Sequence, residues 1–200
     1  MTGMMIILAV GSGLLLGRFW LTPDHADVFT RVSPWALNLL LFGIGFELAD
    51  DRKVWRKMLA MGWRVFLVPL TGALGSLLGA LLAGLLLSLG TWEALSVGAG
   101  FGWYSLSGVL LNNLGFTTLA AIAFLSNVLR EVLAMLSIPW LAKRLDPIAA
   151  IAPGGATTMD TTLPIISRCG TSTATLIALV NGLVLSGLVP LLVPLFAGLI

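Results

Sequence analysis

Long apolar stretches alternate with short polar ones along the chain. Three runs contain no Asp, Glu, Lys or Arg: residues 65–92, 94–129 and 169–200, which are 28, 36 and 32 residues long. Each run is long enough to cross a bilayer, since a spanning helix needs about 20 consecutive apolar residues. Together with two apolar stretches nearer the N-terminus, the pattern predicts about five transmembrane helices. Their expected ranges are 4–20, 34–49, 65–89, 116–142 and 174–200.

Two segments between these helices are rich in Gly, Ser, Thr and Asn, namely residues 96–115 and 149–168. Five basic residues in the loop 50–64 place that loop in the cytoplasm, because Lys and Arg favour the cytoplasmic side. Lys143 and Arg144 place the end of the fourth helix there as well. Both segments then have to leave and return to the same face. We therefore expect two re-entrant, broken-helix hairpins from opposite sides, with the N-terminus in the cytoplasm and the C-terminus outside.

Opposed hairpins of this kind are typical of inverted repeats in secondary transporters, whose substrates bind near the bilayer midplane. Non-helical backbone at that depth is tolerated only where protein or a water-filled cavity surrounds it. A short echo, Leu-Val-Pro-Leu at 67–70 and again at 188–191, is consistent with a repeat. The expected fold is an all-α polytopic membrane protein with a single transmembrane transporter domain over residues 1–200.

The composition excludes several other classes of protein. The chain is 58% hydrophobic and 10% charged, whereas soluble domains carry about 25% charged residues. This argues against a soluble enzyme, a nucleic-acid binder or a secreted disulfide scaffold. A single cysteine, Cys169, and a single histidine, His25, cannot build a disulfide or a protein-only metal site. We expect no cofactor, no metal and no enzymatic activity, because no histidine is placed to activate Ser105 or Ser107.

Glu131 is the residue whose position is most costly, since it lies inside the fourth predicted helix between charge-free stretches. An ionised carboxylate at the bilayer centre costs about 3 kcal/mol or more, so such residues usually face a cavity and carry function. Asn127 lies four residues earlier and shares its helix face. One interpretation is a site that binds a proton or a cation. The alternative is an internal ion pair in which Arg130 or another basic residue neutralises Glu131 and locks the helix bundle.

Asp160 is the second acid of interest, in the Gly- and Thr-rich second hairpin. Thr157 and Asp160 have the spacing of a capping box. One interpretation is therefore that Asp160 caps a half-helix and has no further role. The functional alternative uses the partial positive charge of that half-helix N-terminus to hold a substrate carboxylate. In that case Asp160 and the hydroxyls of Thr157, Thr158 and Thr161 line the pocket.

The first hairpin offers neutral hydrogen-bonding groups. Its glycines allow close backbone approach, and its polar side chains include Tyr104, Ser105, Ser107 and Asn112. These groups could orient a polar substrate. The alternative is close helix–helix packing through small residues, which is common in membranes.

Three motifs resemble the lysine exporter LysO family: GFGWYSLSG at 100–108, AFLSNVLRE at 123–131 and GATTMDTTLP at 155–164. The resemblance extends from about residue 39 to the C-terminus. It implies an exporter of lysine and its toxic analogues in the bacterial inner membrane, with an important acid at Glu131 and Asp160 in the second hairpin motif. Long members have about eight spans, and this chain resembles their C-terminal two-thirds. It would therefore work alone, as a homo-oligomer, or with a small companion membrane protein.

These inferences predict a secondary transporter that exports lysine or a related basic amino acid across the cytoplasmic membrane by proton antiport. Glu131 would alternate between a proton and the ammonium group of the substrate. The expected partners are a cationic amino acid, protons and the lipid bilayer, with no nucleic acid. Two alternatives stay open: an exporter of another small solute on the same scaffold, and a non-transporting membrane subunit that needs a partner chain.

Overall fold

The computed structural model describes residues 62–200 without a gap. Before them it describes single helical positions only, at Ser12, Leu15, Leu16, Trp35, Leu39, Phe42, Phe46, Arg56, Leu59 and Ala60. Apart from these positions, the helices expected at 4–20 and 34–49 and the loop that follows them lie outside the described residues.

Three long helices form the frame of the described part of the chain, in which there is no β-strand. They are α4 Leu67–Leu87, which continues a short 3-10 helix η1 Gly62–Phe66, then α7 Thr117–Arg144 and α9 Ser172–Ala197. All three are long and apolar enough to cross a membrane. Their bounds differ by at most three residues from the ranges expected from the sequence. The prediction of an all-helical membrane protein is therefore confirmed for the described residues.

In helix α4, small residues lie on the side that faces the protein interior and large ones on the exposed side. Leucines such as Leu78, Leu82 and Leu86 are exposed, while the small residues Ala73 and Gly84 are buried. A Cβ on Gly84 would lie only 2.6 Å from the Cβ of Ala94 in the next helix. Small residues thus face the protein interior and let helices approach closely, as in other membrane proteins, and the large leucines face outward.

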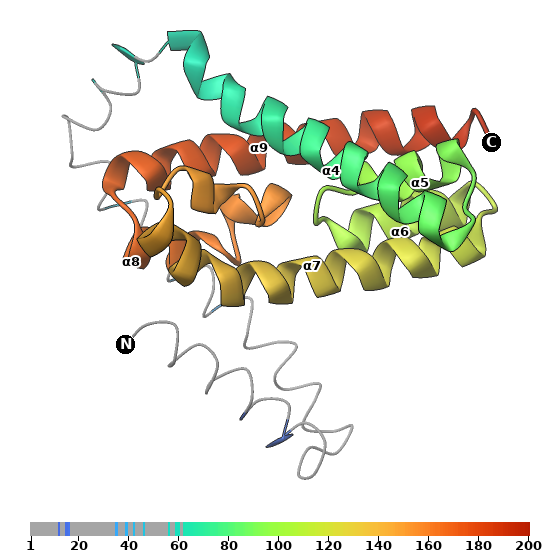
Figure 1. Cartoon of the computed structure of the whole chain (residues 1–200), viewed down its shortest axis with the longest axis horizontal. Coiled ribbons are helices and arrows are strands. Elements are labelled where there is room, and N and C mark those ends of the chain that lie inside the picture. The colour runs from blue at the N-terminus through green and yellow to red at the C-terminus, as the bar shows by residue number, and fades with distance from the viewer. Residues whose placement is uncertain are drawn as a thin grey trace.

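Two broken segments fill the space between α4 and α9 on one side and α7 on the other (Figure 1). The first consists of α5 Thr91–Gly98 and α6 Tyr104–Asn113, and the second of η2 Ala149–Ile151, η3 Gly155–Met159 and α8 Leu163–Cys169. In Figure 1 the first segment begins and ends where α7 begins, and the second begins and ends where α9 begins. Their tips approach each other midway along the long helices.

The first broken segment starts earlier than its expected range of 96–115. Helix α5 begins at Thr91, and the N–H of its N-cap residue Gly90 donates to Glu93 Oε2 at 2.7 Å, which is the half of a capping box that a glycine can form. This bond satisfies one of the N–H groups that every helix start leaves without an intrahelical acceptor. The residues between the third expected helix and the first expected hairpin therefore form a helix start.

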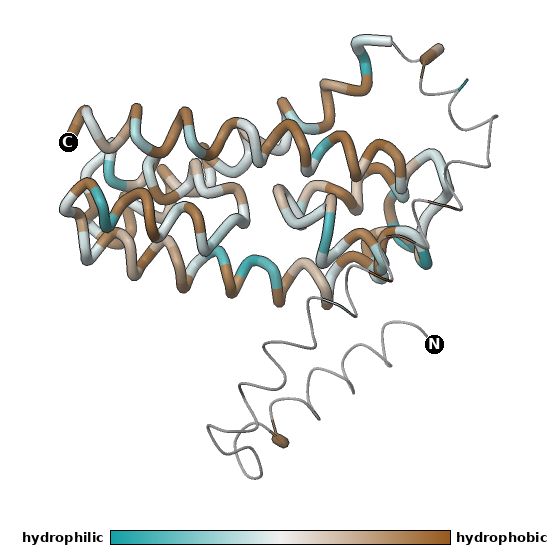
Figure 2. The backbone as a smooth tube through the Cα atoms, turned by 180° about the vertical axis from the view of Figure 1, so that it is seen from behind, coloured by the Kyte–Doolittle hydropathy of each residue, from teal (hydrophilic) through white to brown (hydrophobic). Residues whose placement is uncertain are grey.

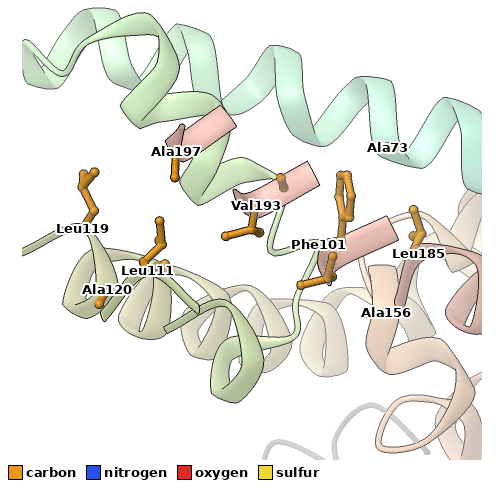
Figure 3. Close-up of a cluster of buried hydrophobic side chains, with 12 residues drawn as sticks. Ala73, Phe101, Leu111, Leu119, Ala120, Ala156, Leu185, Val193 and Ala197 are labelled. Atoms are coloured by element: carbon orange, nitrogen blue, oxygen red, sulfur yellow. The ribbon is translucent and has the colours of Figure 1, made fainter. Parts of the chain in front are cut away.

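The core holds the first tip against α9. Phe101 is fully buried in the break between α5 and α6, and it belongs to a cluster that also contains Leu185 and Val193 of α9 (Figure 3). A second cluster, around Ile151, Ile166 and Ile177, holds the second broken segment. Figure 2 shows that the long helices are mostly hydrophobic, with a short hydrophilic stretch in the middle of α7. The polar chemistry therefore lies at mid-length, where the two tips meet.

Candidate functional site

The tips of the two broken segments are in direct contact. The N–H of Ala156 donates to the carbonyl oxygen of Phe101 at 2.8 Å. Gly155 has φ +60°, and a Cβ at this position would overlap the Phe101 carbonyl. Gly102, at φ +102°, would place a Cβ 3.3 Å from the Gly154 oxygen. Glycine is required at both positions because of the left-handed backbone, and at Gly155 the close approach excludes a side chain as well.

Two asparagines hold these tips to the long helices. Asn127 of α7 is buried, and its Oδ1 accepts a hydrogen bond from the Gly102 N–H at 2.7 Å. Asn181 of α9 is also buried, and its Nδ2 donates to the Gly155 oxygen at 3.0 Å. Asn127 therefore satisfies an N–H group that the break would otherwise leave unpaired in an apolar interior, and Asn181 shares the Gly155 oxygen with the hydroxyl of Thr158.

A pocket of about 180 Å³ lies beside the tip contact. It brings together six of the ten residues expected from the sequence: Tyr104, Ser105, Glu131, Thr157, Asp160 and Thr161. The other lining residues, which were not expected from the sequence, are Gly102, Trp103, Ala156, Met159 and Ser186. Of these, Ser186 could most easily have been predicted from the sequence, because it is a polar residue inside the apolar helix α9.

Two carboxyl groups line this pocket, each from a different element. Glu131 comes from α7 and is 9% exposed. Asp160 comes from the second tip, where its Oδ1 accepts hydrogen bonds from Thr161 N at 2.6 Å and from Thr161 Oγ1 at 3.4 Å. The Thr161 side chain is also within hydrogen-bonding reach of the Glu131 carboxyl. Among the described residues that line the pocket, none is basic.

The environment of Asp160 favours its neutral form. Burial raises the pKa of this carboxyl above its ordinary value, while the N–H and hydroxyl of Thr161 act in the opposite direction. The two acids also repel one another when both are ionised, as the charge of Asp160 acts on Glu131. A pocket with two acids and no base therefore gains from binding a proton or a cation.

Arg130 does not pair with its neighbour Glu131. Its guanidinium donates to the oxygens of Pro153, Ala152 and Ser76 instead, and neither Arg130 nor these three residues line the pocket. The ion pair considered as an alternative from the sequence is not formed in this part of the chain. Glu131 is thus left facing the pocket.

The capping box expected at Thr157 and Asp160 is not formed. The residues 155–159 make a 3-10 helix, Thr157 Oγ1 donates back to the Gly154 oxygen at 2.9 Å, and Asp160 follows that helix. No half-helix therefore starts there with its N-terminus towards the pocket. The helix that does start at the pocket is α6, whose first residues Tyr104 and Ser105 line it.

The remaining four expected residues lie outside the pocket lining. Ser107 and Thr158 are buried and donate to backbone oxygens, of Trp103 at 2.9 Å and of Gly155 and Ala178 at 2.8 Å. Asn127 holds the first tip through the Gly102 N–H. Asn112 is exposed on α6, in a separate groove that continues towards Thr117.

Comparison with known proteins places the chain among exporters. The sequence profile of the family described as lysine exporter LysO matches residues 7–197. The lysine exporter LysO of Escherichia coli K12 is 36% identical over 168 residues, which cover 84% of this chain and 56% of that protein. A Haemophilus influenzae protein provisionally named as a lysine exporter is 32% identical over 192 residues, 96% of each chain. No solved structure matches the chain.

Proposed function

The chain belongs to the lysine exporter LysO family, and on that premise we propose that it exports lysine or a related basic amino acid across the bacterial cytoplasmic membrane. The observation that carries this proposal is the pair of acids, Glu131 and Asp160, in a pocket whose described lining has no base. The chain spans only 56% of the Escherichia coli relative. The activity is therefore proposed from the residues of this chain and is not carried over from that longer protein.

The pocket is chemically complementary to a diamino acid. At neutral pH lysine carries two ammonium groups and one carboxylate, and Glu131 and Asp160 offer one carboxylate to each ammonium group. The first N–H groups of α6 have no acceptor within their own helix and carry partial positive charge. The Tyr104 N–H already donates to the Gly102 oxygen at 3.1 Å, so Ser105, which also lines the pocket, is the residue whose N–H can hold the substrate carboxylate. At about 180 Å³, the pocket suits one small solute.

Proton coupling follows from the same pair of acids. Two carboxylates that share a small pocket resist being ionised together, so one of them favours a proton whenever no cation is bound. Lysine entering from the cytoplasm would displace that proton, and a proton entering from outside would displace lysine. This cycle is a lysine–proton antiport in which Glu131 holds the proton and the ammonium group in turn.

Alternating access would use the two broken segments. We propose that they are re-entrant hairpins from opposite faces of the membrane within a five-span inverted repeat, with the N-terminus in the cytoplasm and the C-terminus outside. The parallel roles of Asn127 and Asn181 support this. Asn127 binds a tip residue 25 positions before it, and Asn181 binds one 26 positions before it. Movement of one half against the other would expose the pocket to each side in turn.

The test is lysine efflux from proteoliposomes that contain the purified chain. We expect export by the wild type and its loss in Glu131→Gln, because the amide can neither release a proton nor neutralise an ammonium group. Glu93→Gln is the matched control, since Glu93 caps α5 away from the pocket. Export by Glu131→Gln at the wild-type rate would contradict the proposal, and so would export of an unrelated solute in place of lysine.

One alternative has a specific observation in its favour. Because nearly half of the Escherichia coli relative has no counterpart in the aligned region, the chain could be a subunit that requires a companion membrane protein. The Haemophilus influenzae relative, which aligns over 96% of both chains, favours independent action or a homo-oligomer. Flux that begins only when a second chain is added would support the subunit.

A further inference from the structure

A hydrogen-bonded relay outside the pocket connects the two broken segments through one residue of α4 and one of α7. The hydroxyl of Ser76 in α4 donates to the Gly98 oxygen, at the end of α5, at 3.0 Å. It also accepts a hydrogen bond from Arg130 Nη1 at 2.9 Å. A serine hydroxyl has one donor and two acceptor sites, so both bonds form at once. Ser76 thereby connects the first broken segment to Arg130.

Arg130 continues the relay to the second segment. Its Nε donates to the Pro153 oxygen at 2.9 Å and its Nη2 to the Ala152 oxygen at 3.3 Å, just before the second tip. Burying a guanidinium is costly unless its donors are satisfied. The arrangement in which Arg130 makes all of these hydrogen bonds is therefore favoured. The planar fork of arginine can reach all three acceptors, which the point charge of a lysine cannot do.

The relay connects the same two segments whose tips line the pocket. The first segment contributes lining residues from Gly102 to Ser105, and the second contributes residues from Ala156 to Thr161. Neither Ser76 nor Arg130 lines the pocket. The separation of the segments therefore sets the width of the pocket without any contact between the relay and the substrate.

We propose that Ser76 and Arg130 are positioning residues that hold the two broken segments at a fixed distance from each other and from α7, and thereby select the substrate by the spacing of its charged groups. This inference rests on the proposed export of a diamino acid. It assigns specificity to two residues outside the pocket. The groups it requires of them are the hydroxyl of Ser76 and the fork of Arg130.

The test compares two serines of one cavity. Ser76 and Ser126 both line a cavity of about 210 Å³ beside Arg130, but Ser126 donates only to the Ala123 oxygen of its own helix at 3.2 Å. Efflux of lysine and of ornithine, which is one methylene shorter, is measured in proteoliposomes. We expect Ser76→Ala to raise the KM for lysine about tenfold, because the groups that bind the substrate are then no longer held in advance at the spacing of its charged groups. We also expect Ser76→Ala to prefer lysine over ornithine less strongly than the wild type does. Ser126→Ala and Ser76→Thr should keep the wild-type KM and the wild-type preference.

Hydrogen–deuterium exchange of the same purified variants gives a readout that needs no substrate. Peptides covering 98–104 and 151–161 should exchange faster in Ser76→Ala than in Ser126→Ala, because both tips lose a fixed partner. Equal exchange in the two variants, or an unchanged preference for lysine in Ser76→Ala, would overturn the proposal. If the wild type moved no lysine, the proposed function would fail, and the exchange comparison would still decide whether the relay holds the tips.

Discussion

Contact between the two tips should depend on the absence of a side chain at Gly155. In Gly155→Ala the new Cβ would overlap the Phe101 carbonyl and lie 2.9 Å from Arg130 Nη2. Both neighbours are fixed, one as backbone and the other by its hydrogen bonds. The second tip must therefore move away from the first.

The expected loss of stability has two parts. Alanine at φ +60° costs about 1–2 kcal/mol relative to glycine because of its left-handed backbone. Displacement of the tip also breaks the bond between Ala156 N and Phe101 O, and a buried hydrogen bond left unmade costs about 1–3 kcal/mol. Together these give a destabilisation of about 2–5 kcal/mol, with loss of transport in the protein that still folds.

Two matched glycines separate these contributions. Gly115 has φ +91°, but a Cβ added there would meet no atom within 4 Å, so Gly115→Ala should show the backbone cost alone. Gly79 lies in α4 with neither strain nor contact, so Gly79→Ala should be neutral or slightly stabilising. Thermal unfolding in detergent gives the ranking and lysine efflux gives the functional effect. If Gly155→Ala were as stable and active as Gly115→Ala, the tips would not be in contact as described.

Two further substitutions test the tip and the second acid. Asn127→Ala leaves the buried Gly102 N–H without its acceptor, so we expect it to lower stability by about 1–3 kcal/mol in thermal unfolding, whereas Asn112→Ala, on an exposed position, should have little effect. Because burial raises the pKa of Asp160, the folded state binds its proton more tightly than the unfolded state. Stability should therefore fall as the pH rises from the ordinary carboxyl range through that raised pKa, and thermal unfolding of Asp160→Asn should lack this part of the pH dependence.

The long helices could be predicted because their signal is regional. The length of an apolar stretch does not depend on how its side chains pack, and the expected ranges 65–89, 116–142 and 174–200 agree with α4, α7 and α9 within three residues. The energetic cost of a buried acid likewise identified Glu131, which the structure places beside a pocket. Whether that pocket binds substrate stays a prediction.

The broken segments were less predictable because their polar side chains follow no regular period. Thr157 and Thr158 are adjacent in the same 3-10 helix, yet one lines the pocket and the other binds backbone oxygens of η3 and α9. The partners of Arg130 are backbone carbonyls exposed by a break, and no sequence pattern marks a carbonyl as an acceptor. The side chains alone therefore indicated Glu131 as the partner of Arg130.

Exchange of a proton for an ammonium group at Glu131 is tested most directly by measuring proton release when lysine binds. Lysine is added to the purified chain in weakly buffered solution, and the pH change is compared among wild type, Glu131→Gln and the control Glu93→Gln. We expect proton release from the wild type and from Glu93→Gln, and none from Glu131→Gln. Lysine binding to the wild type without proton release, or equal release from Glu131→Gln, would contradict the proposed antiport.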